Sequence, residues 1–199
     1  MKKLSFITIL LFSACSNAPA LSPLSEGDTI LAFGDSITYG TGASLRESYP
    51  QVLQSLISKK VVSSGIPGEV TADALKRLPA ILKRYKPRLV LLCEGTNDMA
   101  MILDDKETAK NLREMIGLIK KSGMEVVLIG APRPGAALNV PGFYSEIAGE
   151  FNIPYEGRVL KKILEDSSLR SDPIHPNREG YKIMAETMAA LLNESGAIK

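Results

Sequence analysis

The sequence predicts a three-layer α/β/α sandwich built around a parallel sheet of five strands. From Asp28 onward, short apolar runs alternate with longer amphipathic stretches, which is the pattern of a parallel sheet covered by helices on both faces. The chain has 199 residues and 45% of them are apolar, enough for one well-packed core and too few for two typical domains. In such a sandwich, ligands bind beyond the carboxyl ends of the strands.

The first half of the chain supplies three strands and two helices. The predicted strands are 29–33, 61–64 and 89–93, and the predicted helices are 49–58 and 72–85. Lys86-Pro87 ends the second helix, because the residue before a proline disfavours helical backbone angles. The third strand is apolar throughout, as expected of a strand that is buried on both faces.

The second half supplies two more strands and three helices. Asp104 and Asp105 are capping carboxylates for a helix over 106–121, which Gly123 closes. We expect a strand over 125–129, a Pro- and Gly-rich loop over 131–142, a short helix over 144–150, a weaker strand over 153–155 and a final helix over 178–193. The methionines of the final helix share one apolar face, so we interpret them as core residues.

The N-terminus has the features of an export signal. Lys2 and Lys3 precede a short apolar stretch, and Phe12-Ser13-Ala14-Cys15 resembles the lipobox of bacterial lipoproteins. The apolar stretch is too short for a transmembrane helix, which needs about 20 residues. We therefore predict a signal peptide over 1–14, a lipidated Cys15 that begins a flexible tether over 15–27, and one domain over 28–199. The alternative is an ordinary secretory signal in which Cys15 has no role.

Charge and cysteine content limit the binding partners and the disulfides that the chain can have. The chain has 24 basic and 22 acidic residues, and loss of Lys2 and Lys3 with the signal would leave no basic block, which argues against nucleic-acid binding. If Cys15 carries lipid, only Cys93 remains and no intramolecular disulfide can form. We expect a monomer anchored to a membrane. Ser16 after Cys15 favours the outer membrane, facing the periplasm or the cell surface, over the inner membrane.

Two polar clusters follow predicted strands. Gly34-Asp35-Ser36 ends the first strand, and a serine there would lie at the open edge of the sheet beside a helix N-terminus that favours negative charge. Asn97 follows the third strand and could donate to an oxyanion, as could the backbone N–H of Gly68 after the second strand. Each of these residues also has a purely structural interpretation. Ser36 could be a helix cap, Asn97 could form an Asx turn, and Gly68 could supply a positive φ.

A third cluster, residues 171–177, contains the only histidine of the chain and precedes the final helix. Acyl transfer by a serine requires a base whose pKa is near neutrality, and imidazole meets this requirement. A carboxylate must orient the second ring nitrogen, and Asp172 lies three residues before His175. Pro173 and Pro176 restrict the backbone around the imidazole. We therefore predict a catalytic triad of Ser36, His175 and Asp172.

These motifs resemble blocks I, II, III and V of the SGNH (GDSL-type) hydrolases. They occur in the expected order, and the similarity is strongest to the branch that contains bacterial thioesterase I/lysophospholipase L1 and arylesterase. The resemblance implies a flavodoxin-like sheet with strand order 2-1-3-4-5 and an attack by Ser36 on the acyl carbonyl. It also implies an oxyanion hole formed by the backbone N–H groups of Ser36 and Gly68 and the side chain of Asn97.

Three features depart from that branch. Ser63 stands where asparagine is common, Pro67-Gly68-Glu69 replaces the usual Ser-Gly-Asp, and Thr96 replaces a frequent glycine. These residues neighbour the functional atoms, so we expect them to alter loop geometry and substrate preference. The Gly-x-Ser-x-Gly elbow of α/β-hydrolases is not matched, because Thr38 occupies the position of its last glycine.

The predicted function is hydrolysis of short- to medium-chain esters, thioesters or lysophospholipids through an acyl-enzyme. O-acetyl groups on envelope glycans are an alternative substrate, and a lipid-anchored binding module without turnover is an alternative class. Met99–Leu103 and the loop over 131–143 either line an acyl groove or pack the core, and the sequence does not decide between these. We expect no cofactor and no metal, since one histidine and one remote cysteine offer too few zinc ligands.

Overall fold

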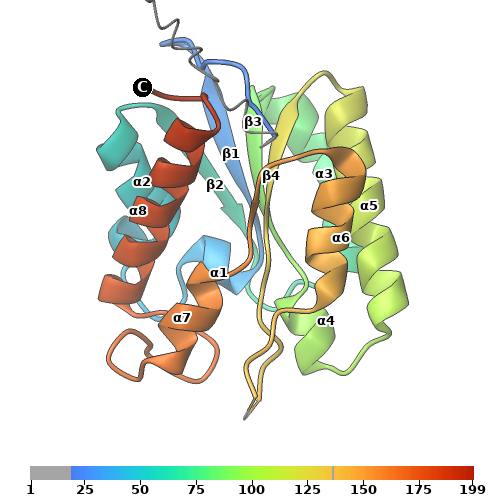
Figure 1. Cartoon of the computed structure of the whole chain (residues 1–199), viewed down its shortest axis with the longest axis vertical. Coiled ribbons are helices and arrows are strands. Elements are labelled where there is room, and N and C mark those ends of the chain that lie inside the picture. Colours follow the sequence, from blue (N-terminus) through green and yellow to red (C-terminus); the bar gives the residue numbers. More distant parts are fainter. Residues whose placement is uncertain (1–18, 136) are drawn as a thin grey trace, which may run out of the picture.

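The computed structural model describes residues 19–135 and 137–199. It is a three-layer sandwich around a parallel sheet with the strand order β2-β1-β3-β4-β5, which confirms both the predicted architecture and the strand order (Figure 1). The strands are β1 (Thr29–Gly34), β2 (Lys60–Gly65), β3 (Leu89–Cys93), β4 (Glu125–Ile129) and β5 (Tyr155–Glu156).

Helices cover both faces of the sheet and bury two apolar clusters. Alternate residues of β1 point to opposite faces, so Ile30 and Ala32 join one cluster while Leu31 and Phe33 join the other. The first cluster is covered by α2 (Tyr49–Ile57), α7 (Val159–Glu165) and α8 (Arg178–Glu194). The second is covered by α3 (Thr71–Tyr85), α5 (Asp105–Lys121) and α6 (Gly142–Phe151) (Figure 1).

No residue range was predicted from the sequence for four elements. They are α1 (Ser36–Tyr39), the 3₁₀ helix η1 (Leu45–Glu47), α4 (Thr96–Ala100) and α7. Three of the four have five residues or fewer, too short for an amphipathic period to be visible. The α7 segment does carry a signal, because Val159, Leu160, Ile163 and Leu164 are buried at helical spacing. The predicted fifth strand was placed two residues too early: β5 begins at Tyr155.

The predicted tether is wrong for the residues that the structure describes. Leu21 and Leu24 are buried, and their N–H groups donate to the carbonyls of Ser195 and Ala197. Ser22 donates from its N–H and its hydroxyl to Glu125. The apolar side chains and the backbone partners after α8 outweigh the loop-like composition of this segment. The predicted signal peptide and Cys15 lie outside the described residues.

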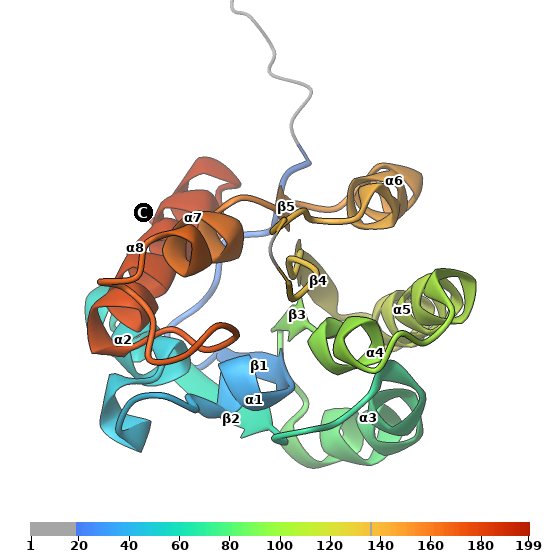
Figure 2. The same ribbon diagram turned by 90° about the horizontal axis from the view of Figure 1, so that it is seen from below.

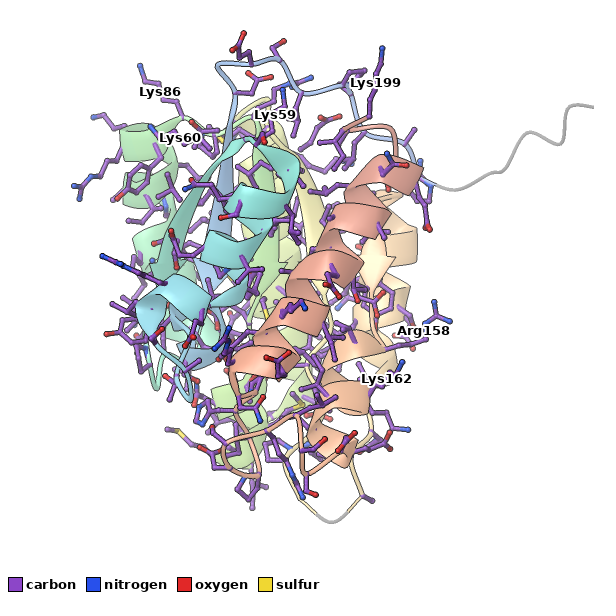
Figure 3. All side chains as sticks on the ribbon, turned by 90° about the vertical axis from the view of Figure 1, so that its left-hand side faces the viewer. Lys59, Lys60, Lys86, Arg158, Lys162 and Lys199 are labelled. Atoms are coloured by element: carbon purple, nitrogen blue, oxygen red, sulfur yellow. The ribbon has the colours of Figure 1, made fainter. Side chains whose placement is uncertain are left out.

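This N-terminal segment lies at the edge of the sheet where the strands begin. Lys59, Lys60, Lys86 and Lys199 lie at the same end of the molecule (Figure 3). Among the residues that the structure describes, no helix is long and apolar enough to cross a membrane.

Candidate active site

Ser36 lies at the carboxyl end of β1 and begins α1. Asp35 is the N-cap of this helix, since its Oδ1 accepts from the N–H of Ile37 at 2.9 Å. Gly34 makes the turn possible: a Cβ at this position would lie 2.2 Å from the carbonyl oxygen of Cys93 and 2.3 Å from Oγ1 of Thr38. Ser36 is therefore the first residue of a short helix, α1, which lies at the carboxyl edge of the sheet, as Figure 2 shows from that side.

The loop before α8 brings His175 to Ser36. Asp172 Oδ1 accepts from the N–H groups of Ile174 and His175, at 2.8 and 2.9 Å, so the carboxylate folds the loop around itself. Asn177 caps α8 through bonds from the N–H groups of Glu179 and Gly180. Figure 2 shows this loop running from α8 toward α1. The imidazole is thus positioned by its own turn and by the start of a packed helix.

The three predicted triad residues form a continuous chain of hydrogen bonds. His175 Nε2 lies 2.9 Å from Ser36 Oγ, and His175 Nδ1 lies 2.7 Å from Asp172 Oδ2. Burial raises the pKa of Asp172, but the hydrogen bonds from the imidazole and from the two backbone N–H groups outweigh it and hold the pKa below its usual value. An ionised Asp172 favours the tautomer with the proton on Nδ1, which leaves Nε2 free to accept a proton from the serine.

Asn97 lies in α4 at the end of β3, and its side chain turns toward the loop after β2. Its Nδ2 donates to the carbonyl oxygen of Glu69 at 2.8 Å. Because a carbonyl oxygen only accepts, the atom of the Asn97 amide that faces it must be the nitrogen. The second N–H of this nitrogen is then free to donate to another acceptor. Gly68, in the same loop, has a φ of 80°. The structure thus brings the loops of Ser36, Gly68 and Asn97 to one edge.

Two carboxyl groups are buried beneath Ser36. Asp35 and Glu94 are both fully buried, and Asp35 Oδ2 and both oxygens of Glu94 have no hydrogen-bond partner within residues 19–135 and 137–199. Burial raises the pKa of Asp35 to about 6, and burial together with the nearby Asp35 raises the pKa of Glu94 well above its usual value. Both carboxyl groups are therefore shielded from solvent, and burial favours their protonated forms.

Exposed apolar side chains lie at the same edge of the sheet as Ser36 and form what we call the apolar rim. It consists of large side chains on the loops and short helices at the carboxyl edge: Tyr39, Leu45, Ile66, Met101, Ile102 and Leu103. Ile102 is 87% exposed, so residues 101–103 do not pack the core, whereas Met99 is buried. This resolves the alternatives for 101–103 in favour of a surface position. A cavity of about 410 Å³ opens between α1, η1 and β2, with Tyr39, Leu45 and Ser63 in its lining.

The second predicted wall, the loop over 131–143, lies beside this rim. Arg133 in the loop donates to Asp105 at 2.6 Å, and Asp105 follows the exposed residues 101–103 closely in the chain. Its apolar residues Ala131, Val140 and Phe143 pack in or against the cluster under α5, and Val140 also lines a cavity of about 400 Å³ beside α6 and β5.

In the described part of the chain, Cys93 is buried and no group of side chains forms a candidate metal site. Cys93 is unpaired and buried, and burial raises the pKa of its thiol well above the usual value. Within residues 19–135 and 137–199, no three His, Cys, Asp or Glu side chains are grouped so that they could hold a metal ion.

Sequence reasoning missed the side chains that support the loop after β2. Glu69 is buried and forms an ion pair with Arg77 of α3, and Thr71 donates from its N–H and its hydroxyl to Asp98. The departure Pro67-Gly68-Glu69 pointed to this loop, but nothing in the sequence linked it to Arg77.

Comparisons with known proteins identify relatives of this chain in sequence and in fold. Residues 32–183 match the model of the GDSL-like Lipase/Acylhydrolase family. The chain is 30% identical to thioesterase 1/protease 1/lysophospholipase L1 of Escherichia coli, over 94% of this chain and 89% of that protein. It is 28% identical to the uncharacterized lipoprotein YqeF of Bacillus subtilis, over 51% of this chain and 47% of that protein. The fold matches esterase EstA of a Pseudoalteromonas species, inhibited by monoethylphosphonate, with a TM-score of 0.74, 23% identity and coverage of 84% and 97%.

Proposed function

Because the chain belongs to the GDSL-like lipase/acylhydrolase family and is an esterase of that family, we propose that Ser36, His175 and Asp172 hydrolyse carboxylic esters and thioesters through an acyl-enzyme. The observation that carries this proposal is the chain of hydrogen bonds from Ser36 Oγ through the imidazole to Asp172, at 2.9 and 2.7 Å.

In the first half of the reaction, Ser36 Oγ attacks the acyl carbonyl while His175 Nε2 takes the serine proton. The carbonyl oxygen becomes an oxyanion, which accepts from the N–H groups of Ser36 and Gly68 and from the free N–H of Asn97. Collapse of this intermediate breaks the bond to the alcohol or thiol. The imidazolium gives its proton to that leaving group, and the acyl group stays on Ser36.

In the second half, water replaces the leaving group. His175 takes one proton from the water as its oxygen attacks the acyl-serine, and the same oxyanion donors act again. Collapse releases the carboxylic acid and returns the proton to Ser36. Throughout both steps, Asp172 stays ionised and stabilises the imidazolium without taking its proton.

A parallel assay of three proteins tests the triad: the wild type, Ser36→Ala and His175→Ala. With p-nitrophenyl acetate as substrate, each substitution should lower kcat by roughly 10⁴- to 10⁶-fold, and thermal unfolding should stay cooperative. Folded variants with wild-type turnover would exclude this triad. A folded wild type that cleaves no ester would favour the alternative of a binding module.

We infer further that the acyl chain lies along the apolar rim. Chain lengths are compared with p-nitrophenyl esters from acetate to palmitate, using Ile102→Ser and, as the matched control, Leu56→Ser. Leu56 is an exposed apolar residue of α2, away from the carboxyl edge of the sheet. Activity on medium and long chains should fall in Ile102→Ser and not in the control. An optimum at acetate with no effect of Ile102 would instead favour an O-acetyl group as the substrate.

For localisation, we propose that Cys15 is lipidated and that the domain is anchored to the outer membrane. The lipobox-like residues before Cys15 and the partial match to a lipoprotein support the anchor. Leu21 packs at the edge where the strands begin, so few residues separate Cys15 from the folded domain. Lys59, Lys60, Lys86 and Lys199 share that end (Figure 3) and would approach anionic headgroups, with the site at the opposite end.

Metabolic labelling with an alkyne fatty acid tests this arrangement. The wild type should carry the label and co-fractionate with the outer membrane, and Cys15→Ser should lose both properties. Labelling with fractionation to the inner membrane would retain the anchor and refute the choice of membrane. A soluble, unlabelled wild type would refute the anchor.

A further inference from the structure

A charged pair with little exposure to solvent joins the loop after β2 to α3. Arg77 of α3 donates from Nε to Glu69 Oε1 at 2.8 Å and from Nη2 to Glu69 Oε2, so the two side chains meet in a bidentate ion pair. The exposed fractions of the two side chains are only 17% and 6%. Such pairs are both strong and directionally specific.

Arg77 is itself held from two other sides. Its Nη1 donates to the hydroxyl of Ser64 at 2.7 Å, and its guanidinium lies 4.1 Å from the centre of the Phe33 ring. Ser64 and Phe33 are paired with each other in β2 and β1, immediately below the catalytic edge. The guanidinium is thus held against the sheet, and its ion pair with Glu69 restricts the position of the Glu69 side chain.

Glu69 closes a tight turn that contains Gly68. The N–H of Glu69 donates to the carbonyl of Ile66, with Pro67 in the second position and Gly68, at a φ of 80°, in the third, as in a type II turn. At the other end of the turn, the N–H of Ile66 donates to the carbonyl of Gly34 at 3.0 Å. The turn is therefore fastened to β1 at one end and to Arg77 at the other.

The same residue also orients Asn97. The carbonyl oxygen of Glu69 accepts from Asn97 Nδ2 at 2.8 Å. Two proposed oxyanion donors, the N–H of Gly68 and the second N–H of Asn97, therefore depend on the position of one residue. A displacement of Glu69 would move both donors together.

We propose that Arg77, acting through its bidentate ion pair with Glu69, is a positioning residue for the oxyanion hole. The inference rests on the proposed triad, because it concerns the charge that develops when Ser36 attacks. It assigns Arg77 no contact with substrate. Its effect is to keep Gly68 and Asn97 directed at a common point during the reaction.

Arg77→Lys and Glu69→Gln test the proposal. Lysine keeps the charge but cannot form two parallel hydrogen bonds, and glutamine keeps the shape but loses the charge. Each variant should lower kcat for p-nitrophenyl acetate by about 10- to 100-fold and leave KM within about twofold, because a donor displaced by about 1 Å acts mainly on the transition state. Arg113→Lys, in an exposed ion pair between α5 and α6, is the matched control and should retain the wild-type kcat.

Two readouts separate positioning from stability. Titration of Ser36 with a fluorophosphonate gives the concentration of active sites, so a loss of folded protein does not appear as a lower kcat. In a cycle with Asn97→Ala, the combined loss should be smaller than the product of the single losses, because Arg77 acts partly through Asn97. If Arg77→Lys does not fold, the kcat per titrated site of Glu69→Gln alone tests the proposal.

An unchanged kcat per titrated site in Glu69→Gln and in folded Arg77→Lys would overturn the inference, as would losses that multiply fully in the cycle. Ser36→Ala is measured in the same experiment. Full activity in Ser36→Ala would refute the proposed triad itself, whereas a Ser36-dependent rate that is insensitive to Arg77 and Glu69 would refute only the positioning role.

Discussion

The buried carboxyl of Asp35 makes a quantitative prediction about stability. Its side chain is fully buried, one oxygen accepts from Ile37, and burial raises its pKa from 3.8 to about 6. A shift of this size corresponds to about 3 kcal/mol. Because the folded-state pKa is the higher one, the native state binds the proton more tightly, and stability falls as pH rises from about 4 through about 6.

Replacement of Asp35 by asparagine removes this pH-dependent cost. The amide keeps an acceptor for the Ile37 N–H, and the nearby buried hydroxyl of Thr96 can accept from the new N–H₂. Relative to wild type, Asp35→Asn should gain up to about 3 kcal/mol at pH 8 over its value at pH 4. Urea unfolding at pH values from 4 to 8 measures this difference.

Asp166→Asn is a control of opposite sign. Hydrogen bonds from the hydroxyl and the N–H of Ser168 lower the pKa of Asp166, so this carboxylate stabilises the fold at neutral pH and loses that effect in acid. Relative to wild type, its asparagine variant should lose stability as pH rises. A stability difference between wild type and Asp35→Asn that stays constant from pH 4 to 8 would refute the argument that burial dominates the ionisation of Asp35.

Four further substitutions separate orientation, oxyanion binding and packing. Asp172→Asn should lower kcat for p-nitrophenyl acetate by roughly 10⁴-fold, because the amide no longer selects the tautomer; a loss below tenfold would contradict this role. Asn97→Ala should lower kcat by roughly 10²- to 10³-fold with little change in KM, and a wild-type kcat would remove Asn97 from the mechanism. Gly65→Ala should destabilise the domain, since the new Cβ would lie 2.2 Å from the backbone N of Tyr39. Gly117→Ala, in open space on α5, should instead raise stability by about 0.5–1 kcal/mol. Equal melting temperatures of the two variants would contradict the packing argument.

The large elements could be predicted because each one carries its own periodic pattern. Leu89–Cys93 is apolar throughout and is the central strand, and the helix over 106–121 was placed within one residue of α5. The candidate triad was accessible for a related reason: Ser36 and His175 lie in short motifs whose chemistry is visible locally, and a parallel sheet brings its strand ends to one edge.

What the sequence did not reveal depends on contacts between distant residues. Glu69 and Arg77 are ordinary charges in the sequence, and only the packing of α3 against β1 and β2 makes them a buried pair. The same holds for Leu21 and Leu24, whose burial requires the backbone after α8 as a partner. Both misses arise from tertiary packing that overrides local composition, which propensity and periodicity cannot represent.

The ionisation of Asp35 has opposite effects on the two charges that develop during acyl transfer. A carboxylate beneath Ser36 would repel the oxyanion, but it would attract the imidazolium of His175, and this attraction is among the effects that lower the pKa of Asp35. Glu94 is buried nearby, and burial together with Asp35 raises its pKa well above the usual value, which reduces the negative charge that it adds to the site. If the repulsion dominates, Asp35→Asn should increase kcat above pH 6; if the attraction to His175 dominates, kcat should fall there. A pH profile of kcat in this variant therefore distinguishes which of the two charges limits the reaction.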